Sequence, residues 1–129
     1  MKAIRSSAPV GIEGLVYEDT PDPKPAIGDV LVKVHACGFT ASELFWPLYT
    51  DRAGRDRAPV IPGHEFSGRV VELGYGTAGV AVGDEVYGLI DGYRDGAAVE
   101  LIAIEARDVA PVPTTIDHVQ AASLPQAGL

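Results

Sequence analysis

The chain has 129 residues, which is enough for one domain with a buried core and too short for a two-domain enzyme. Hydrophobic residues make up 47% of it, but no apolar run approaches the roughly 20 residues of a membrane span, and the first residues lack the apolar stretch of a signal peptide. The net charge of −8 argues against nucleic acid and acidic membrane surfaces as partners, and the single cysteine excludes an internal disulfide and a multi-cysteine zinc cluster. We therefore expect a soluble, cytoplasmic, globular domain.

Short strands separated by turns dominate the expected secondary structure. Fifteen glycines and ten prolines are spread along the chain without a repeat, which is typical of many short strands. The valines at 30, 32 and 34 alternate with residues that include Lys33 and His35, so one face of this strand is predicted to be buried. Strands are predicted over residues 2–5, 14–17, 30–36, 66–73, 85–89 and 97–104. So many short strands in one domain favour a mainly β fold, a closed or nearly closed barrel.

Two short helical segments are also expected. Residues 40–45 form the first, which Thr40 or Ser42 can cap and which Pro47 would end. A polar loop follows over residues 49–59. The second helix is predicted over residues 116–123, with Asp117 in its first turn.

The most specific pattern lies between residues 62 and 88. The run Pro-Gly-His-Glu-Phe-Ser-Gly at 62–68 is followed by Gly-Asp-Glu-Val-Tyr-Gly at 83–88. Glycines such as Gly63 and Gly68 permit close backbone approach or an unusual φ at the entry to a strand. His64 and Glu65 place an imidazole and a carboxylate together, which suits either a metal ligand beside a carboxylate or a proton relay.

The order and spacing of these segments resemble the N-terminal domain of the medium-chain dehydrogenase/reductase superfamily. That domain is a GroES-like (co-chaperonin-like) partly open β-barrel with short helices, and in the family it precedes a Rossmann domain that binds NAD(P). The resemblance covers nearly the whole chain. Besides residues 62–88, it rests on four segments: 2–3, 28–38, 96–104 and 121–125.

In zinc-dependent members of this superfamily, the second residue after the glycine that matches Gly38 is a cysteine ligand, and here it is Thr40. Threonine supplies no thiolate. Cys37 lies three residues earlier, an odd offset that would place it on the opposite face of a continuing strand. The third ligand would lie beyond this chain, and the four-cysteine lobe of many relatives has no counterpart. The comparison therefore predicts no bound metal; if zinc is bound after all, His64 and Glu65 are its expected ligands.

The pattern then resembles the zinc-free branch of quinone oxidoreductase-like and enoyl-reductase-like enzymes. In that branch a polar residue replaces the cysteine and helps to hold the nicotinamide or the substrate, and a tyrosine in the following loop commonly lines the same cleft. The resemblance implies Thr40 and Tyr49 as catalytic residues, with Thr40 also binding the cofactor, NADPH or NADH. The implied reaction is hydride transfer from the nicotinamide to a small electron-poor carbonyl or conjugated alkene, such as a quinone or an enone.

Each of these side chains also has a purely structural interpretation. Thr40 then caps the helix, Tyr49 packs in the interior, and the imidazole of His64 makes a local hydrogen bond. Structural roles are also expected for three other residues. Cys37 is expected to be a small buried side chain. His35 and His118 are expected to lie at the surface or to have hydrogen-bonded imidazoles.

The resemblance divides the chain into a catalytic, substrate-binding domain over residues 1–115 and the start of a connection to a Rossmann domain over residues 116–129. Gly74, Gly76 and Gly79 are predicted to be turn glycines and not a phosphate loop, because no helix follows them. The dinucleotide site is therefore expected outside this chain, and any homodimer is expected to form through the second domain. Two alternative functions are a zinc-dependent alcohol dehydrogenase with altered ligands and a non-enzymatic GroES-like interaction module.

Overall fold

The computed structural model describes residues 1–46 and 48–129, and strands dominate it. Two antiparallel sheets account for all of its named strands. In chain order the elements are β1 (Lys2–Ser6), the 3-10 turn η1 (Gly11–Gly14), β2 (Leu15–Asp19), β3 (Asp29–Gly38), η2 (Glu43–Phe45), β4 (Glu65–Leu73), β5 (Glu85–Leu89), β6 (Leu101–Glu105), η3 (Ala106–Asp108), β7 (Val109–Pro111), α1 (His118–Ala122) and α2 (Pro125–Gly128).

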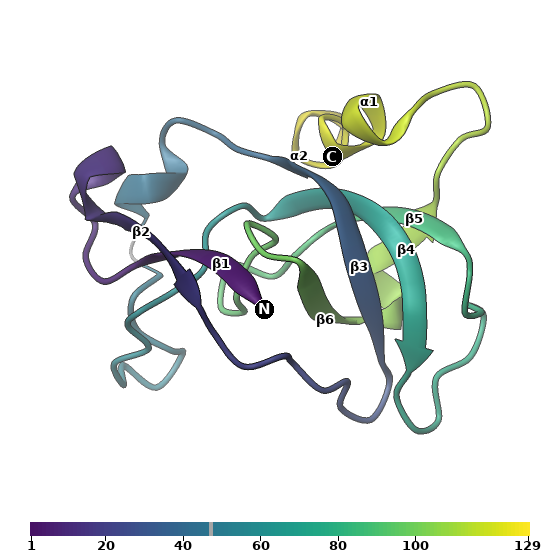
Figure 1. Cartoon of the computed structure of the whole chain (residues 1–129), viewed down its shortest axis with the longest axis horizontal. Coiled ribbons are helices and arrows are strands. Elements are labelled where there is room, and N and C mark those ends of the chain that lie inside the picture. Colours follow the sequence, from purple (N-terminus) through teal and green to yellow (C-terminus); the bar gives the residue numbers. More distant parts are fainter. Residues whose placement is uncertain (47) are drawn as a thin grey trace.

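The larger sheet has five strands in the order β6-β3-β4-β5-β7. Its longest pair is β3 with β4, which run side by side and curve together (Figure 1). The core lies against this sheet, where its largest fully buried apolar side chains are Val30, Val32, Phe66, Val70 and Ile104. Burial of each such side chain contributes about 1.5–3 kcal/mol to the free energy of folding, so these strands carry much of the stability.

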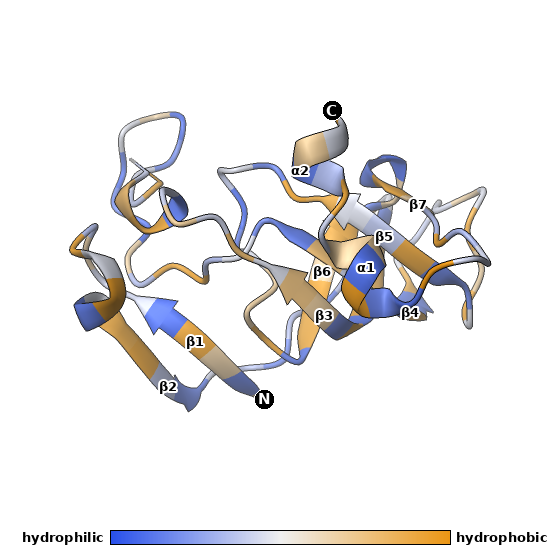
Figure 2. Cartoon of the chain, turned by 90° about the horizontal axis from the view of Figure 1, so that it is seen from above, coloured by the Kyte–Doolittle hydropathy of each residue, from blue (hydrophilic) through white to orange (hydrophobic). Residues whose placement is uncertain are grey.

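The smaller sheet pairs β1 with β2 and lies beside the larger one (Figure 2). Single bridges tie β1 to the rest of the fold, from Ala3 to Val99 and from Ser6 to Val60. These bridges join β1 to connecting segments, and no continuous ladder links the two sheets among the described residues. The barrel is therefore partly open, as the family resemblance implied.

The structure confirms the predicted strands to within two residues at most ends, with one clear exception. The strand expected over residues 97–104 begins only at Leu101, because Ala97 and Ala98 instead hydrogen-bond to the backbone at residues 62–63. The short strand β7 was not predicted, since three residues carry too little alternation to register.

The helices are shorter than the sequence patterns indicate. The helix expected over residues 40–45 is a single 3-10 turn, and neither Thr40 nor Ser42 caps it with its side chain. Pro47, which was expected to end it, lies outside the described residues. The helix expected over residues 116–123 is α1, where Asp117 is the N-cap and forms a capping box with Gln120.

Helix α1 packs over the ends of β3, β4 and β5, with α2 beside it (Figure 1). The hydroxyl of Ser67 on β4 donates a hydrogen bond to the carbonyl oxygen of His118 at 2.6 Å, which anchors the start of α1 to the sheet. None of the helices in the described part of the chain is long and apolar enough to cross a membrane.

Candidate active site at the ends of β3 and β4

The residues singled out by the sequence gather where β3 ends and β4 begins. Gly38, the last residue of β3, pairs with Glu65, the first residue of β4, and Cys37 pairs with Phe66. A side chain at position 38 would collide with the Glu65 side chain, so a glycine is needed for this close approach. The two strand ends thereby bring residues 37–43 next to residues 63–65.

A buried pair formed by Glu43 and His64 lies at the centre of this site. The two residues are 5% and 3% exposed, and Oε1 of Glu43 contacts Nδ1 of His64. The same oxygen accepts a hydrogen bond from the backbone N–H of Gly63 at 2.6 Å. Nε2 of His64 lies 3.1 Å from the carbonyl oxygen of Arg94. Both ring nitrogens therefore face oxygen atoms of the protein, which fixes the orientation of the imidazole.

The sequence patterns did not identify Glu43 as a site residue. Glu43 lies in the first turn of η2, where an acidic residue is a common signal for the start of a helix. Its partner is 21 residues away, so only the tertiary fold shows that its carboxylate is turned inward to orient His64.

Gly63 is required by both its backbone conformation and its neighbours. Its φ of +87° lies in the left-handed region that L side chains rarely adopt, and a Cβ there would collide with Sγ of Cys37. The glycine thus allows the backbone before β4 to turn while it lies directly against the thiol.

Cys37 is half-buried and belongs to the same cluster. Burial, together with the negative charges of Glu43 and Glu65, raises the pKa of its thiol to about 12. The alternation that would place it opposite Thr40 does not apply, because β3 ends at Gly38 before reaching residue 40. In the metal-free chain this side chain is a protonated thiol at neutral pH.

Thr40 lies just after β3, and its carbonyl oxygen accepts a hydrogen bond from the N–H of Glu43 at 3.0 Å. Its hydroxyl oxygen is shielded from solvent and has no hydrogen-bond partner among the described residues. Leaving a buried hydroxyl unpaired costs about 1–3 kcal/mol, so such groups in native proteins call for an explanation. An oxygen atom of a bound ligand would satisfy it.

The hydroxyl of Tyr49 is engaged elsewhere. It shares a hydrogen bond of 2.8 Å with the hydroxyl of Ser6 on β1, and so links the loop after η2 to the smaller sheet. Tyr49 does line a small cavity together with Glu43 and His64. No hydrogen bond joins it to Thr40 within the described residues, and its catalytic role stays a prediction.

Glu65 connects the site to the C-terminal helices. It is buried, and its Oε2 accepts a hydrogen bond from the backbone N–H of Gln126 in α2 at 3.1 Å. His64 and Glu65 are neighbours in sequence, but their side chains have different partners. The imidazole of His64 contacts Glu43, and the carboxylate of Glu65 binds the backbone of α2.

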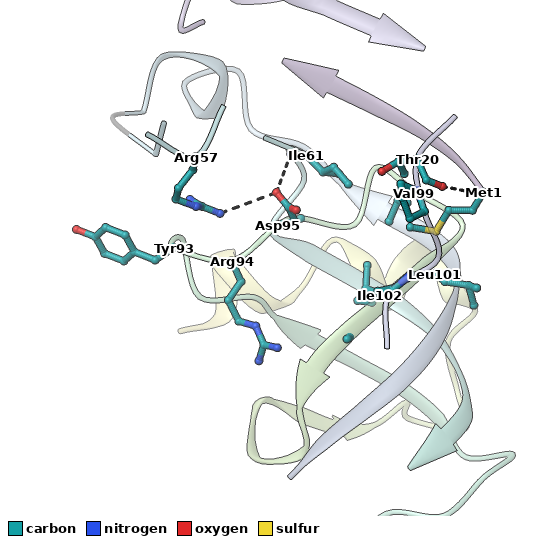
Figure 3. A pocket seen from close by; sticks show the side chains of 14 residues that line it. Met1, Thr20, Arg57, Ile61, Tyr93, Arg94, Asp95, Val99, Leu101 and Ile102 are labelled. Carbon is teal, nitrogen blue, oxygen red and sulfur yellow. Dashed lines mark hydrogen bonds and ion pairs between the residues drawn. The ribbon is translucent and has the colours of Figure 1, made fainter. Parts of the chain in front are cut away.

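A second cavity of about 390 Å³ is lined by residues of the β5–β6 connection and of β6, together with residues near the N-terminus (Figure 3). Met1, Thr20 and Val99 line it, with Asp95 joined by dashed lines to Arg57 and to the backbone of Ile61 in Figure 3. Thr40, Tyr49, His64 and Glu65 do not line it, so this cavity is not the site that the sequence predicts.

Comparison with known proteins places the chain in a family. The family model described as the alcohol dehydrogenase GroES-like domain matches residues 26–114. An alcohol dehydrogenase of Geobacillus stearothermophilus is 30% identical over 91% of this chain and 42% of its own length, and a mitochondrial NAD(P)H oxidoreductase of Dictyostelium discoideum is 29% identical over 86% of this chain and 32% of its own length.

Solved structures of related proteins have the same fold as this chain. The quinone oxidoreductase of Coxiella burnetii superposes on 99% of this chain with a TM-score of 0.88 and 28% identity, and that of Pseudomonas syringae on 98% with a TM-score of 0.85 and 26% identity. The chain spans 42% and 38% of those two structures, well under two thirds of their lengths. By its family match and its fold, the chain belongs to the alcohol dehydrogenase GroES-like domain family, the N-terminal domain of medium-chain dehydrogenase/reductase proteins.

Proposed function

We propose that this chain is the substrate-side domain of an NAD(P)H-dependent oxidoreductase that reduces quinones, enones or related carbonyl compounds without a catalytic zinc ion. The single observation that carries the proposal is the Thr40 hydroxyl, shielded and unpaired at the point where zinc-dependent relatives place a cysteine ligand. The relatives named as NAD(P)H and quinone oxidoreductases support the nicotinamide cofactor and the substrate class.

The residues at this site do not fit a catalytic zinc ion. Zinc sites require thiolate, imidazole or carboxylate donors with free lone pairs. Thr40 offers a neutral hydroxyl in place of the thiolate, and the Cys37 thiol lies directly against Gly63. Both nitrogens of His64 face oxygen acceptors. Of the two carboxylates at the site, Glu43 is bound to His64 and to the N–H of Gly63, and Glu65 is bound to the backbone of α2.

In the proposed reaction the nicotinamide supplies the hydride when it is bound. The hydroxyl of Thr40 donates a hydrogen bond to the substrate oxygen, which gains negative charge as the hydride arrives, and this favours the transition state over the ground state. The buried Glu43–His64 pair holds residues 40–43 against residues 63–65 and so keeps Thr40 in place. Tyr49 lines the interior beside this pair.

We place the dinucleotide-binding site on a Rossmann domain that follows residues 116–129. Gly74, Gly76 and Gly79 lie in the turn between β4 and β5, where a strand and not a helix comes next. A phosphate-binding loop uses the free N–H groups of a helix start, which this turn does not provide. The hydrogen bond from Gln126 to Glu65 supports α2 as the element that connects the site to the following domain.

The experiment measures NADPH and NADH oxidation by the full protein that contains this chain, with a panel of quinones, enones and aldehydes, together with its metal content. We expect turnover with at least one class of substrate and no loss of activity when a chelator removes any bound metal. Stoichiometric zinc and loss of turnover on its removal would instead support a zinc-dependent alcohol dehydrogenase. Absence of turnover across the panel would contradict the proposal.

A further inference from the structure

Three side chains outside the candidate active site converge on the sheet face beneath α1. One ring nitrogen each of His35 and His118 and a carboxylate oxygen of Glu85 all lie within 4.8 Å of one another. They come from β3, α1 and β5, so residues far apart in sequence meet at one point. The two imidazole rings are 4.3 Å apart between centroids.

A β-bulge directs His35 to this point. In the β3–β4 ladder Val34 pairs with Gly68 and Ala36 with Ser67, which leaves His35 as the extra, unpaired residue. A bulge bends the strand and re-aims the side chain of the extra residue. The imidazole of His35 is thereby exposed beside the first residue of α1.

The position of His118 is fixed by its backbone. Its carbonyl oxygen accepts the hydrogen bond from Ser67, and the capping box between Asp117 and Gln120 holds the first turn of α1. Its Nδ1 is shielded from solvent and has no hydrogen-bond partner among the described residues. The other ring nitrogen, Nε2, faces Glu85, and a side chain held this firmly presents that nitrogen in a fixed position.

Glu85 presents one oxygen to the two imidazoles. Arg69 binds Oε1 and holds the pKa of this carboxyl below its usual range, so the group is ionised at neutral pH. The other oxygen, Oε2, lies 2.8 Å from Nε2 of His118, at ion-pair distance. The carboxylate is therefore held by Arg69 on one side and faces the imidazole of His118 on the other.

We propose that His35, Glu85 and His118 form a binding site for a divalent transition metal ion of the zinc class, separate from the Thr40 site. Two imidazoles and one carboxylate are a donor set that such ions prefer over Mg²⁺ or Ca²⁺. The bound ion would join the start of α1 to β3 and β5, and so fix where the chain leaves the sheet. The positive charge of Arg69 opposes the ion, so the site is weaker than a four-ligand structural zinc site.

The test is isothermal titration of the metal-free full protein with Zn²⁺ and, separately, with Mg²⁺. We expect a Zn²⁺ site with no counterpart for Mg²⁺. His35→Ala and Glu85→Gln should each weaken that site at least about tenfold, the smaller end of the effect of disturbing metal ligation. Glu72→Gln, which changes an exposed carboxylate on β4, is the matched control and should bind Zn²⁺ as the unaltered protein does.

His35 is exposed, so its replacement should leave the fold intact, which circular dichroism without metal checks directly. In the metal-free protein His35→Ala and the unaltered chain should melt within about 2 °C of each other, as expected for an exposed side chain. The proposal is overturned if Zn²⁺ gives no binding heat, or if His35→Ala and Glu85→Gln bind it with unchanged affinity, since the ion then binds elsewhere.

Discussion

The hydroxyl of Thr40 is shielded from solvent yet unpaired among the described residues, which separates its functional interpretation from the structural one. A capping hydroxyl would accept a hydrogen bond from a backbone N–H of η2, and the hydroxyl of Thr40 accepts none. For Thr40→Ala in the full protein we expect kcat/KM to fall by about 10²-fold, as for loss of a donor to a developing oxyanion. The free energy of unfolding should change by less than about 1 kcal/mol, because no hydrogen bond is lost.

Steady-state kinetics with the best quinone or enone substrate and urea denaturation measure both quantities. Ser42→Ala is the matched control, since Ser42 is exposed and makes no cap hydrogen bond. Equal kcat/KM values for the Thr40 and Ser42 variants would show that the hydroxyl plays no part in the reaction.

Glu43 is the residue whose role emerges only from the fold. Its carboxylate binds both the imidazole of His64 and the N–H of Gly63 in the interior. Glu43→Gln replaces this carboxylate by a neutral amide that cannot serve both groups equally, and leaving a buried polar group unsatisfied costs about 1–3 kcal/mol. We expect the free energy of unfolding, from urea denaturation, to fall by about 2 kcal/mol. Glu13→Gln, an exposed substitution in η1, should change it by less than about 0.5 kcal/mol; equal effects would contradict the role assigned to Glu43.

At the scale of elements, an ion pair joins the start of β3 to the β5–β6 connection. Arg94 donates to both carboxylate oxygens of Asp29, at 3.2 and 2.7 Å, and the carbonyl oxygen of Arg94 faces His64. The hydrogen bonds from Arg94 hold the pKa of Asp29 below its usual value. Because Arg94 is partly exposed, the pair is worth less than a fully buried one.

For Asp29→Asn we expect the free energy of unfolding at pH 7 to fall by about 2 kcal/mol. A carboxyl whose pKa is lowered by folding stabilises the protein above its unfolded pKa and loses that contribution as the pH falls through the folded value. The difference between Asp29→Asn and the unaltered chain should therefore be constant near neutrality and shrink below about pH 4. Urea denaturation between pH 3 and 7 measures it, with Asp22→Asn, at an exposed acid, as control. A difference that does not change with pH would contradict the assignment to this carboxylate.

A second prediction at the scale of elements concerns Gly63, in the turn before β4. Gly63→Ala must place a Cβ in the left-handed region and against Sγ of Cys37, whereas Gly54→Ala, at φ +80°, meets nothing within 4 Å. We expect Gly54→Ala to cost about 1–2 kcal/mol for the backbone alone and Gly63→Ala to cost more. In thermal unfolding, a Cys37→Gly background should recover the excess at position 63, because it removes the colliding sulfur. Equal melting temperatures for the two alanine variants would show that the collision is absent.

At the scale of the whole molecule, we propose that the chain carries the substrate side of a site whose cofactor side lies elsewhere. We expect calorimetry to show no micromolar binding of NADPH to the 129-residue chain, and clear binding to the full protein. The physical reason is that the glycines at 74, 76 and 79 lie in a turn between strands, with no helix start to hold a pyrophosphate. Micromolar affinity of the isolated chain would contradict the placement of the cofactor site.

The amino-acid sequence alone was sufficient for most of the strands, for Asp117 at the start of α1 and for the family motif around His64. These signals are local: alternation of side chains, glycine and proline at turns, and a capping residue act over a few positions. Two elements are too short to give a reliable local signal: strand β7 was not predicted, and the single turn η2 was predicted as a longer helix.

Only the tertiary structure decided which side chains meet. It paired Glu43 with His64, placed the Cys37 thiol against Gly63, and brought His35 within reach of His118. Strand register, a bulge and the packing of α1 on the sheet produce these contacts between residues 20 or more positions apart. Side-chain partners depend on where whole strands align, which no local periodicity encodes, so the chemistry of the site became clear only from the fold.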